Sequence, residues 1–600
     1  MKSLSRILMT MVLGLAVCAP AAAQYSSESG FAILQQNCMT CHGQATVPRA
    51  PSVGALRELS PERIYEVLNT SGIAAHQTLK LSDEDKKSVA ESTSARILGT
   101  STSGDAKNMP NRCTSNPPMA DPSASPGWNG WGNDTGNTRF QPAKAAGLTA
   151  DQASRLKVKW TFGIPGGRAS HSQPTVASGR VFVGSDTGWL YSIDASTGCV
   201  YWSFLMKGGT RTAPTVAPIK GQGSAKYAVY IGDLKSYVYA VDAQTGRGLW
   251  TSRVDDHYGA RITGAATVYD GKVFVPLAKW ESNSARVLSY ACCSVRGSVT
   301  ALDANTGKQI WKHYTIEEPP KPVRINSAGT QLWAPSGGTV WNAPTVDTKL
   351  GVIYYGTGEA TSHPAGLTTD AVLAVDIKTG KRVWSYQGTA NDAYIIGCTG
   401  ATITENCPEN IGPDNDIGAS PILMTLSNGK RVLVAAQKMG NVFALDPDNK
   451  GATLWRVKLG PGGIVWGGAA EGDLIYYGLT GGGVIAIKAA NGERVWYNEL
   501  QPPPGKGRSA NGAAVSAMPG VVFSGSRTGM FYALSSANGA KLWEFDTARD
   551  FETNNRVPAH GGTMGSAGST IAGGMVFVGS GYNFGNADKT GNVIIAFSAD

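Results

Sequence analysis

A short pattern recurs through most of this 600-residue chain and constrains its fold more than any other feature. In its clearest form, an aspartate is followed by a glycine and then by a tryptophan, as in Asp194, Gly198 and Trp202. Such self-similarity predicts a repeat architecture built from one supersecondary unit. Six further copies keep the tryptophan four residues after the glycine: Gly246 and Trp250, Gly307 and Trp311, Gly380 and Trp384, Gly451 and Trp455, Gly492 and Trp496, and Gly539 and Trp543.

Each copy follows segments that have the alternating or small-residue pattern of β-strands. In the first repeat these segments are 173–176, 181–184 and 189–193, and the strand of the tryptophan makes four strands per repeat. The eighth copy, 576–597, ends before its glycine and tryptophan, and the segment 157–160 supplies the missing outer strand. We therefore predict an all-β, eight-bladed β-propeller over residues 128–600, closed by pairing the two ends of the domain.

Composition agrees with a turn-rich β protein. Glycine accounts for 75 of the 600 residues, and charged side chains make up only 16%, where ~25% is usual. This excludes a disordered chain or a coiled coil. The formal net charge is +9, but the chain has no run of five or six basic residues and no zinc-finger spacing. We therefore predict no nucleic-acid partner.

The first 23 residues have the order of a secretory signal peptide. Lys2 and Arg6 precede an apolar run at 7–17, and three alanines at 21–23 provide a small-residue cleavage site before Gln24. This order predicts a signal peptide at 1–23 and a periplasmic mature protein. No later stretch of 18 apolar residues occurs, so we expect no transmembrane segment.

A haem-attachment motif follows the predicted signal peptide. Cys38, Met39, Thr40, Cys41 and His42 form the pattern C-x-x-C-H, in which two thiols form thioethers to haem and the histidine binds the iron. The alternative interpretation is a redox C-x-x-C pair followed by histidine by chance. The βαβ context of thioredoxin-like proteins is missing around the motif, which favours haem c with His42 as an iron ligand.

Helix signals surround this motif and indicate a small all-α domain. The segment 26–36 leads into the motif as a helix, Pro61 opens a second helix, and Ser82 caps a third. Three short helices around one covalent haem resemble a class I cytochrome c domain, and we assign it to residues 24–100. The segment 101–127, rich in Ser, Asn, Pro and Gly, is predicted to be a linker to the propeller.

The second axial ligand of the haem stays open at this point. Class I domains usually place a methionine after the middle helix, where this chain has Ile73 instead. The alternatives are His76, Met109, Met119 or a vacant position. His76 is also compatible with an ordinary surface histidine.

The eight repeats resemble the quinoprotein alcohol dehydrogenases, propellers that hold pyrroloquinoline quinone (PQQ) and Ca²⁺ over the central channel. In that family a tryptophan under the quinone precedes a calcium ligand by 18 residues, and Trp341 and Glu359 keep this interval. Glu359 stands at the position where that family has an asparagine as the calcium ligand. A quinone-binding threonine precedes a calcium-binding glutamate by the same interval, which Thr263 and Glu281 match.

Two further positions match the catalytic residues of that family. Lys438 corresponds to the basic residue that contacts the quinone oxygens. Asp414, in the string Asp-Asn-Asp followed by Pro421, corresponds to the catalytic base and a further calcium ligand, although the family tryptophan of this motif is missing. Asp392, eight residues after Trp384, is the alternative base.

Eight cysteines remain after the predicted signal peptide. Several members of the resembled family carry an adjacent pair as a vicinal disulfide against the quinone, which implies the same bond and the same contact for Cys292 and Cys293. The alternative is two separate structural cysteines. Cys398 and Cys407 are expected to close a loop, and Cys113 and Cys199 form the remaining pair.

A cytochrome and a PQQ propeller on one chain imply a quinohaemoprotein. This chain resembles the group of cytochrome-type polyvinyl alcohol dehydrogenases. The resemblance rests on the predicted amino-terminal haem domain of this chain and on its segments 291–298, 413–421 and 558–562. This resemblance implies oxidation of secondary alcohols to ketones, with electrons passing through haem c to a soluble cytochrome c or the respiratory chain. Two alternatives stay open: a dehydrogenase for small alcohols or aldehydes, and a non-enzymatic binding propeller.

Overall fold

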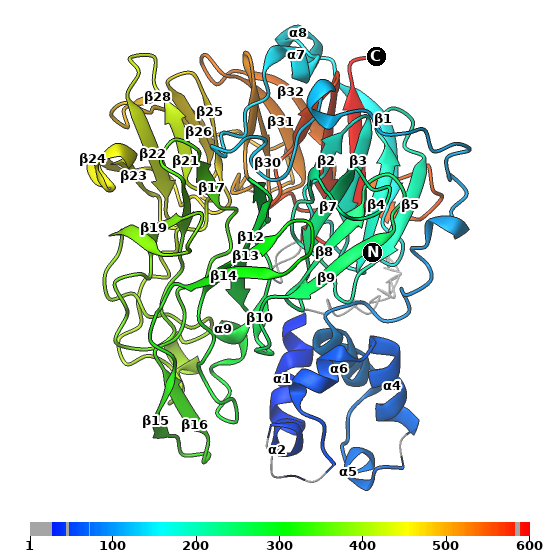
Figure 1. Ribbon diagram of the computed structural model, residues 1–600, viewed down its shortest axis with the longest axis vertical. Helices are drawn as coiled ribbons and strands as arrows, with labels where there is room; N and C mark the ends of the chain where they lie inside the picture. Colours follow the sequence, from blue (N-terminus) through cyan, green and yellow to red (C-terminus); the bar gives the residue numbers. More distant parts are fainter. Residues whose placement is uncertain (1–26, 44–46, 48, 71, 508, 583–588) are drawn as a thin grey trace, which may run out of the picture.

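The computed structural model describes residues 27–43, 47, 49–70, 72–507, 509–582 and 589–600. The predicted signal peptide, 1–23, lies outside the described residues. A small helical domain sits at one end of a much larger array of β-sheets (Figure 1). Among the described residues, no helix has the length and apolar character needed to cross a bilayer.

Eight sheets of at least four antiparallel strands each form a ring, which confirms the predicted number of blades. The first four blades after the start of the ring consist of β2 (Thr175–Ala177), β3 (Arg180–Gly184), β4 (Trp189–Asp194) and β5 (Val200–Leu205); β6 (Thr215–Pro218), β7 (Tyr227–Gly232), β8 (Tyr237–Asp242) and β9 (Gly248–Arg253); β10 (Ala260–Arg261), β11 (Thr267–Tyr269), β12 (Lys272–Lys279), β13 (Ser298–Asp303) and β14 (Gln309–Tyr314); and β17 (Thr345–Asp347), β18 (Val352–Gly356), β19 (Ala371–Asp376) and β20 (Arg382–Gln387).

The other blades continue in chain order, and two small hairpins project from the loops. These four blades are β21 (Ile422–Thr425), β22 (Arg431–Ala436), β23 (Asn441–Asp446) and β24 (Ala452–Lys458); β25 (Gly468–Glu471), β26 (Leu474–Gly478), β27 (Val484–Lys488) and β28 (Arg494–Asn498); β29 (Ser516–Met518), β30 (Val521–Gly525), β31 (Met530–Ser535) and β32 (Lys541–Asp546); and β35 (Thr570–Ala572), β36 (Met575–Ser580), β37 (Val593–Ser598) and β1 (Lys157–Gly163). The first hairpin pairs β15 (Lys321–Ile325) with β16 (Gln331–Ala334), and the second pairs β33 (Asp550–Phe551) with β34 (Ala559–His560).

The two ends of the propeller close the ring together. β1 pairs antiparallel with β37, and Trp160 lies opposite Ala596. The outer strand of the last blade therefore comes from the beginning of the propeller, as the sequence predicts. This pairing removes the exposed strand edges that an open array would leave.

The repeated glycine and tryptophan join each blade to the next. Gly246 has a φ of +76°, and a Cβ added there would lie 2.7 Å from the indole of Trp202 in the preceding blade. The Nε1 of Trp202 donates a hydrogen bond of 3.1 Å to the carbonyl oxygen of Ala243. A side chain at the glycine position would displace the indole, so both repeat residues are structural. The core lies in these interfaces between blades.

The helical domain contains the helices that the sequence predicts, together with three shorter ones. Gly30 lets two of its helices cross closely, because a Cβ there would lie 2.0 Å from the carbonyl oxygen of Ser88. Ser82 caps the last helix through a capping box with Asp85. The helices are α1 (Ser27–Asn37), α2 (Met39–His42), α3 (Val53–Glu58), α4 (Pro61–Thr70), α5 (Ala74–Gln77) and α6 (Asp83–Ser94).

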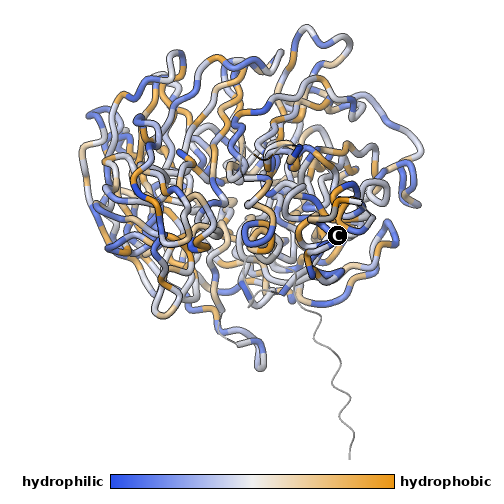
Figure 2. The backbone as a smooth tube through the Cα atoms, turned by 90° about the horizontal axis from the view of Figure 1, so that it is seen from below, coloured by the Kyte–Doolittle hydropathy of each residue, from blue (hydrophilic) through white to orange (hydrophobic). Residues whose placement is uncertain are grey.

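The predicted linker, 101–127, runs along the propeller and is attached to it. A disulfide joins Cys113 to Cys199 of the first complete blade, and a β-bridge joins Arg112 to Val200. Viewed from the end that carries the helical domain, hydrophilic loops form much of the rim (Figure 2). Short helices also occur in the linker and in the loops of the propeller: η1 (Ala106–Asn108), η2 (Pro122–Ala124), α7 (Ala143–Ala146), α8 (Ala150–Ala153), α9 (Glu281–Ser284), η3 (Gly400–Thr402) and η4 (Pro447–Asn449).

Candidate active site

A cavity of about 420 Å³ lies among loops that connect different blades. This volume lies within the ~300–1,000 Å³ that is typical of small-molecule sites. Five of the predicted site residues line it: Thr263, Trp341, Glu359, Asp414 and Lys438. Other lining residues include Arg211, Lys279, Trp280, Thr339, Tyr394, Asp416, Trp466, Arg527 and Tyr582.

Trp341 provides a flat apolar surface in this cavity. A Cβ added to Gly418 would lie 1.8 Å from the indole of Trp341, so the ring rests directly on the glycine backbone. Its Nε1 donates a hydrogen bond of 3.1 Å to Oδ2 of Asp416, and Trp466 packs edge-on with its ring centre 5.3 Å away. These contacts fix the plane of the indole beside the acidic residues.

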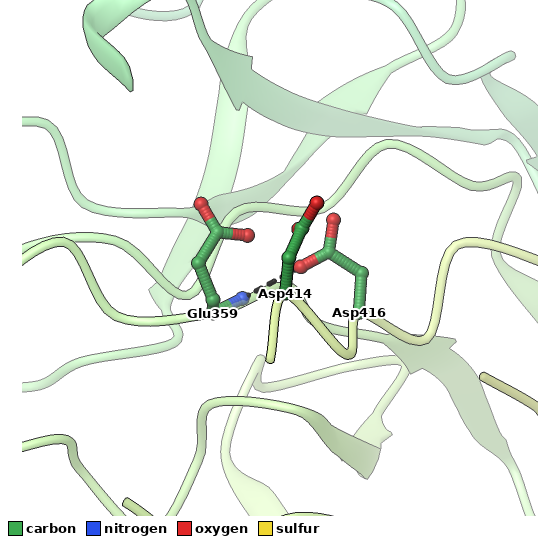
Figure 3. A group of neighbouring side chains, drawn as sticks. All are labelled: Glu359, Asp414 and Asp416. Carbon is green, nitrogen blue, oxygen red and sulfur yellow. Dashed lines mark hydrogen bonds between the residues drawn. The ribbon is translucent and has the colours of Figure 1, made fainter. Parts of the chain in front are cut away.

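Three carboxylate groups lie close to one another in the cavity (Figure 3). Glu359 follows β18, whereas Asp414 and Asp416 come from the loop that precedes β21. One oxygen from each residue lies within 4.8 Å of the other two. The backbone N–H of Glu359 donates a hydrogen bond of 2.8 Å to Oδ1 of Asp416, which joins the two loops.

Two lysines neutralise part of this negative charge. The Nζ of Lys438 lies 2.8 Å from Asp414 Oδ1 and 2.9 Å from Asp416 Oδ2. The Nζ of Lys279 lies 2.6 Å from Glu359 Oε1. Three carboxylates therefore contact only two ammonium groups. Carboxylate oxygens outnumber the lysine ammonium groups in this cluster, so the cluster can offer oxygen ligands to a metal ion.

Burial and neighbouring charges divide the pKa values of the three acids. Burial, reinforced by the Asp416 carboxylate, raises the pKa of Asp414 to about 6. Burial and the same neighbour raise the pKa of Glu359 well above its ordinary value, with Lys279 opposing. Burial disfavours the charged form of Asp416 too, but Lys438 holds its pKa far below the usual range. A pKa of about 6 brings Asp414 close to neutrality, as a general base requires.

Asp392, the alternative base, lies behind the loop of Asp414. It is fully buried, and its Oδ2 accepts a hydrogen bond of 2.7 Å from the backbone N–H of Asn415. The structure does not place Asp392 among the cavity-lining residues that it describes. Its position supports the loop that carries Asp414.

Glu281, the other expected calcium ligand, is held by hydrogen bonds from its own part of the chain. Its carboxylate is buried and accepts hydrogen bonds of 2.7 Å and 2.8 Å from the backbone N–H groups of Ser294 and Val295. The hydroxyl of Tyr290 donates a further bond of 3.2 Å. These donors satisfy the charge of Glu281, and its side chain is not part of the carboxylate cluster found among the described residues. Glu281 as a metal ligand stays a prediction.

All three expected disulfides are present, including the vicinal one between Cys292 and Cys293. The vicinal pair is buried in an apolar cluster with Tyr290 and with the Cys398–Cys407 disulfide. Neither of the two adjacent cysteines is among the described residues that line the cavity. The predicted bond is confirmed, and the contact with a quinone stays a prediction.

The predicted haem-attachment residues lie at the junction of α1 and α2. Cys38 and Cys41 are free thiols and are partly exposed. His42 shares a hydrogen bond of 2.7 Å between its Nδ1 and the carbonyl oxygen of Pro51. Met109 is buried in an apolar cluster of the propeller with Trp160, and Met119 packs against another propeller cluster. The structure thus places both methionines outside the helical domain.

Trp280 connects the cavity to the helical domain. It lines the cavity, and its ring centre lies 6.1 Å from that of Phe31 on α1. The guanidinium of Arg261 sits over both rings, 4.7 Å from the centre of Trp280 and 5.0 Å from that of Phe31. The same apolar cluster extends through Leu34 to Cys38.

Sequence reasoning missed several of these residues. Asp416 stands in the Asp-Asn-Asp string, and its spacing of two from Asp414 was the available signal for a second acid at one site. Lys279 ends β12, and no local pattern marks it. Trp280 stands next to Glu281 in sequence, but only the folded chain brings it to α1.

The residues present fit the cofactors that the resemblance implies. The Trp341 indole, supported by Gly418, is suited to stacking against a planar quinone. Oxygen ligands from Glu359, Asp414 and Asp416 match the preference of Ca²⁺, and Arg211, Arg527 and Lys438 provide positive charge for an acidic quinone. Two thiols and a histidine in the C-x-x-C-H order fit haem c.

Comparison with known proteins identifies related propellers. Residues 128–396 match the family model described as the glucose/ethanol/alcohol dehydrogenase β-propeller domain. Residues 438–548 and 482–600 match a second model, described as outer membrane protein assembly factor BamB. Both models describe repeat propellers, so the second match reflects shared blades in the carboxyl-terminal half.

Two curated relatives match almost the whole chain. A polyvinylalcohol dehydrogenase of a Pseudomonas species is 39% identical, covering 96% of this chain and 95% of the relative. A polyvinylalcohol dehydrogenase of a Sphingopyxis species is 36% identical, covering 95% and 93%. The structure of the quinohemoprotein alcohol dehydrogenase of Comamonas testosteroni is similar in fold, with a TM-score of 0.57 at 20% identity over 79% of this chain and 80% of that one.

Proposed function

This chain belongs to the PQQ-dependent alcohol dehydrogenase family, and we propose that it oxidises secondary alcohol groups, such as those of polyvinyl alcohol, to ketones with PQQ, Ca²⁺ and haem c. The observation that carries the proposal is the cluster of Glu359, Asp414, Asp416 and Lys438 beside the Trp341 platform. The substrate class is supported by the two relatives that match nearly the whole chain.

Each cofactor has a defined set of candidate residues in this chain. Trp341 would stack against PQQ, and Thr263 and Lys438 would contact its polar edge. Glu359, Asp414 and Asp416 would hold Ca²⁺. When bound, PQQ accepts a hydride from the alcohol carbon, Ca²⁺ polarises the reacting oxygens, and haem c carries single electrons away.

Asp414 is the group that takes the proton of the alcohol. Its carboxylate lines the cavity, and its side chain is 30% exposed, while that of Asp416 is 5% exposed. The alcohol loses a hydride from carbon and a proton from oxygen, which together leave a ketone. Lys438, 2.8 Å from Asp414 Oδ1, would stabilise the carboxylate before proton transfer and the negative charge that develops on the acceptor.

The route for electrons out of the cavity runs along α1. Trp280 lines the cavity and packs against Phe31. Phe31, Leu34 and Cys38 lie on one face of the helix, at positions i, i+3 and i+7. Because Cys38 would be bonded to haem, this apolar contact leads from the cavity to the porphyrin. A soluble cytochrome c or the respiratory chain would then receive the electrons in the periplasm.

One experiment separates this function from its alternatives. The full-length protein is reconstituted with PQQ and Ca²⁺, and haem absorption is followed after addition of polyvinyl alcohol, 2-butanol or ethanol. We expect haem reduction with the secondary alcohols and little with ethanol. Faster reduction with ethanol would favour a dehydrogenase for small primary alcohols. No PQQ binding at all would favour a binding propeller and overturn the proposal.

A further inference from the structure

Two histidine rings lie close together in the helical domain. His42 ends α2 and His76 lies in α5, and their ring centres are 6.2 Å apart with a 34° angle between the ring planes. These are the only histidines between residues 24 and 100. Both helices lie at the end of the domain remote from the propeller (Figure 1).

This separation matches two ligands on opposite sides of one metal ion. A bond between a divalent metal ion and an imidazole nitrogen is ~2.0–2.1 Å long, and the ring centre lies a further ~1.1 Å beyond that nitrogen. Two histidines that bind one ion from opposite sides therefore have ring centres ~6.2–6.4 Å apart. The rings of His42 and His76 are already at this spacing.

The hydrogen bond of His42 leaves the correct nitrogen for the metal. The carbonyl oxygen of Pro51 can only accept, so Nδ1 of His42 carries the proton in their 2.7 Å bond. The Nε2 atom then has a free lone pair, which is the usual arrangement for a metal-binding histidine oriented by a second partner.

The alternative ligands lie in unsuitable places. Met39 is the only methionine between residues 24 and 100, and it packs in the apolar cluster of Phe31 and Leu34. Met109 and Met119 pack against propeller clusters instead. Ile73, at the position of the usual methionine, has no donor atom.

We propose that His76 is the second axial ligand of the haem iron, opposite His42. This inference rests on the proposed attachment of haem c to Cys38 and Cys41. Two imidazole ligands give a lower reduction potential than the histidine and methionine pair that is common in cytochromes c, because a methionine ligand raises the potential. The haem is therefore expected to be six-coordinate and closed to small external ligands.

Spectroscopy of the full-length protein tests the ligand directly. Covalent haem is first measured by the pyridine haemochrome assay, and the absence of haem would overturn both the proposed cofactor and this inference. In haem-loaded wild type we expect a low-spin spectrum, no far-red charge-transfer band of a methionine–iron bond, and no carbon monoxide binding. A methionine band or carbon monoxide binding in wild type would contradict His76 ligation.

Substitutions then distinguish ligation from a packing role. His76→Ala should become high-spin and bind carbon monoxide, and added imidazole should restore the low-spin spectrum. His76→Met should acquire the methionine band and a higher midpoint potential. Gln77→Ala in the same short helix is the matched control and should resemble wild type. A His76→Ala protein that keeps both its fold and a low-spin haem without imidazole would overturn the assignment.

Discussion

The helical domain and the propeller cavity assemble their functional side chains in opposite ways. Cys38, Cys41 and His42 lie within one short string of the sequence, and α1 and α2 present them together. The cavity instead joins distant blades: Arg211 donates a hydrogen bond of 2.6 Å to the hydroxyl of Tyr582, 371 residues away. The first kind of site depends on local helices, and the second depends on closure of the whole ring.

The two regions also differ in charge. The cavity cluster contains three carboxylates and two lysines in contact, so its pKa values depend on each neighbour. The ring centres of the two histidines of the helical domain are 6.2 Å apart, a separation that suits a metal ion between them. Substitutions in the cavity should therefore alter proton transfer and metal binding, whereas substitutions in the helical domain should alter the haem alone.

The largest expected effect separates the regions completely. A double variant, Cys38→Ser with Cys41→Ser, should lack covalent haem and lose cytochrome c reduction, because no thioether can form. Reduction of an artificial dye by the propeller should continue at least in part. Parallel assays with dye and cytochrome c check this. A folded, PQQ-loaded double variant without dye activity would show that the two sites are not separable.

A substitution of the base tests the cavity alone. Asp414→Asn keeps the shape of the side chain but cannot take a proton, so turnover with dye should fall ~10²-fold or more, the usual scale of general-base catalysis. The haem spectrum should not change. Asp392→Asn is the matched comparison, because Asp392 lies behind the same loop. If Asp392→Asn is inactive and Asp414→Asn remains active, the assignment of the base is wrong.

The two glutamates should separate metal binding from stability. Glu359→Gln removes one charge from the cluster, and the Ca²⁺ concentration needed for PQQ binding should rise by at least the ~10–100-fold that loss of an outer partner costs. Glu281→Gln should leave that requirement unchanged but lower the free energy of unfolding by ~1–3 kcal/mol, because its bonds to backbone N–H groups weaken. Calcium-dependent PQQ titrations and thermal unfolding measure both. If only Glu281→Gln needs more Ca²⁺ for PQQ binding, Glu281 and not Glu359 would be the metal ligand.

The smallest expected effect concerns the contact between the regions. Trp280→Leu removes the aromatic ring between the cavity and Phe31, and reduction of haem by alcohol should slow severalfold. Trp280→Phe keeps an aromatic contact and should be closer to wild type. Stopped-flow absorption of the haem measures the rate, with dye turnover as the reference. Equal haem reduction in Trp280→Leu and wild type would exclude this route.

The fold was predictable because its information repeats along the chain. Seven repeat glycines pack on the tryptophan of the preceding blade, as Gly246 does on Trp202, so one local rule specifies seven of the eight interfaces. The closing pair of β1 and β37 followed from the incomplete eighth repeat. The three disulfides also agree with the sequence-based pairing.

The cavity was predictable only where side-chain direction follows from position. Trp341 and Glu359 keep the family interval, and both side chains line the cavity. Thr263 and Glu281 keep the same interval, but Glu281 begins α9 and turns toward the amides of Ser294 and Val295. An interval fixes where the backbone lies, whereas nearby hydrogen-bond donors decide where a buried charge points.

Closure of the ring by β1 and β37 imposes an order on maturation. β37 (Val593–Ser598), the strand that pairs with β1, follows all the other strands of the ring in sequence, while the helical domain precedes the ring. Domains near the amino terminus generally fold first during synthesis. The proposed haem site at Cys38 and Cys41 would therefore be formed while the propeller is still open, and removal of β37 would leave that site attached to an unsealed ring.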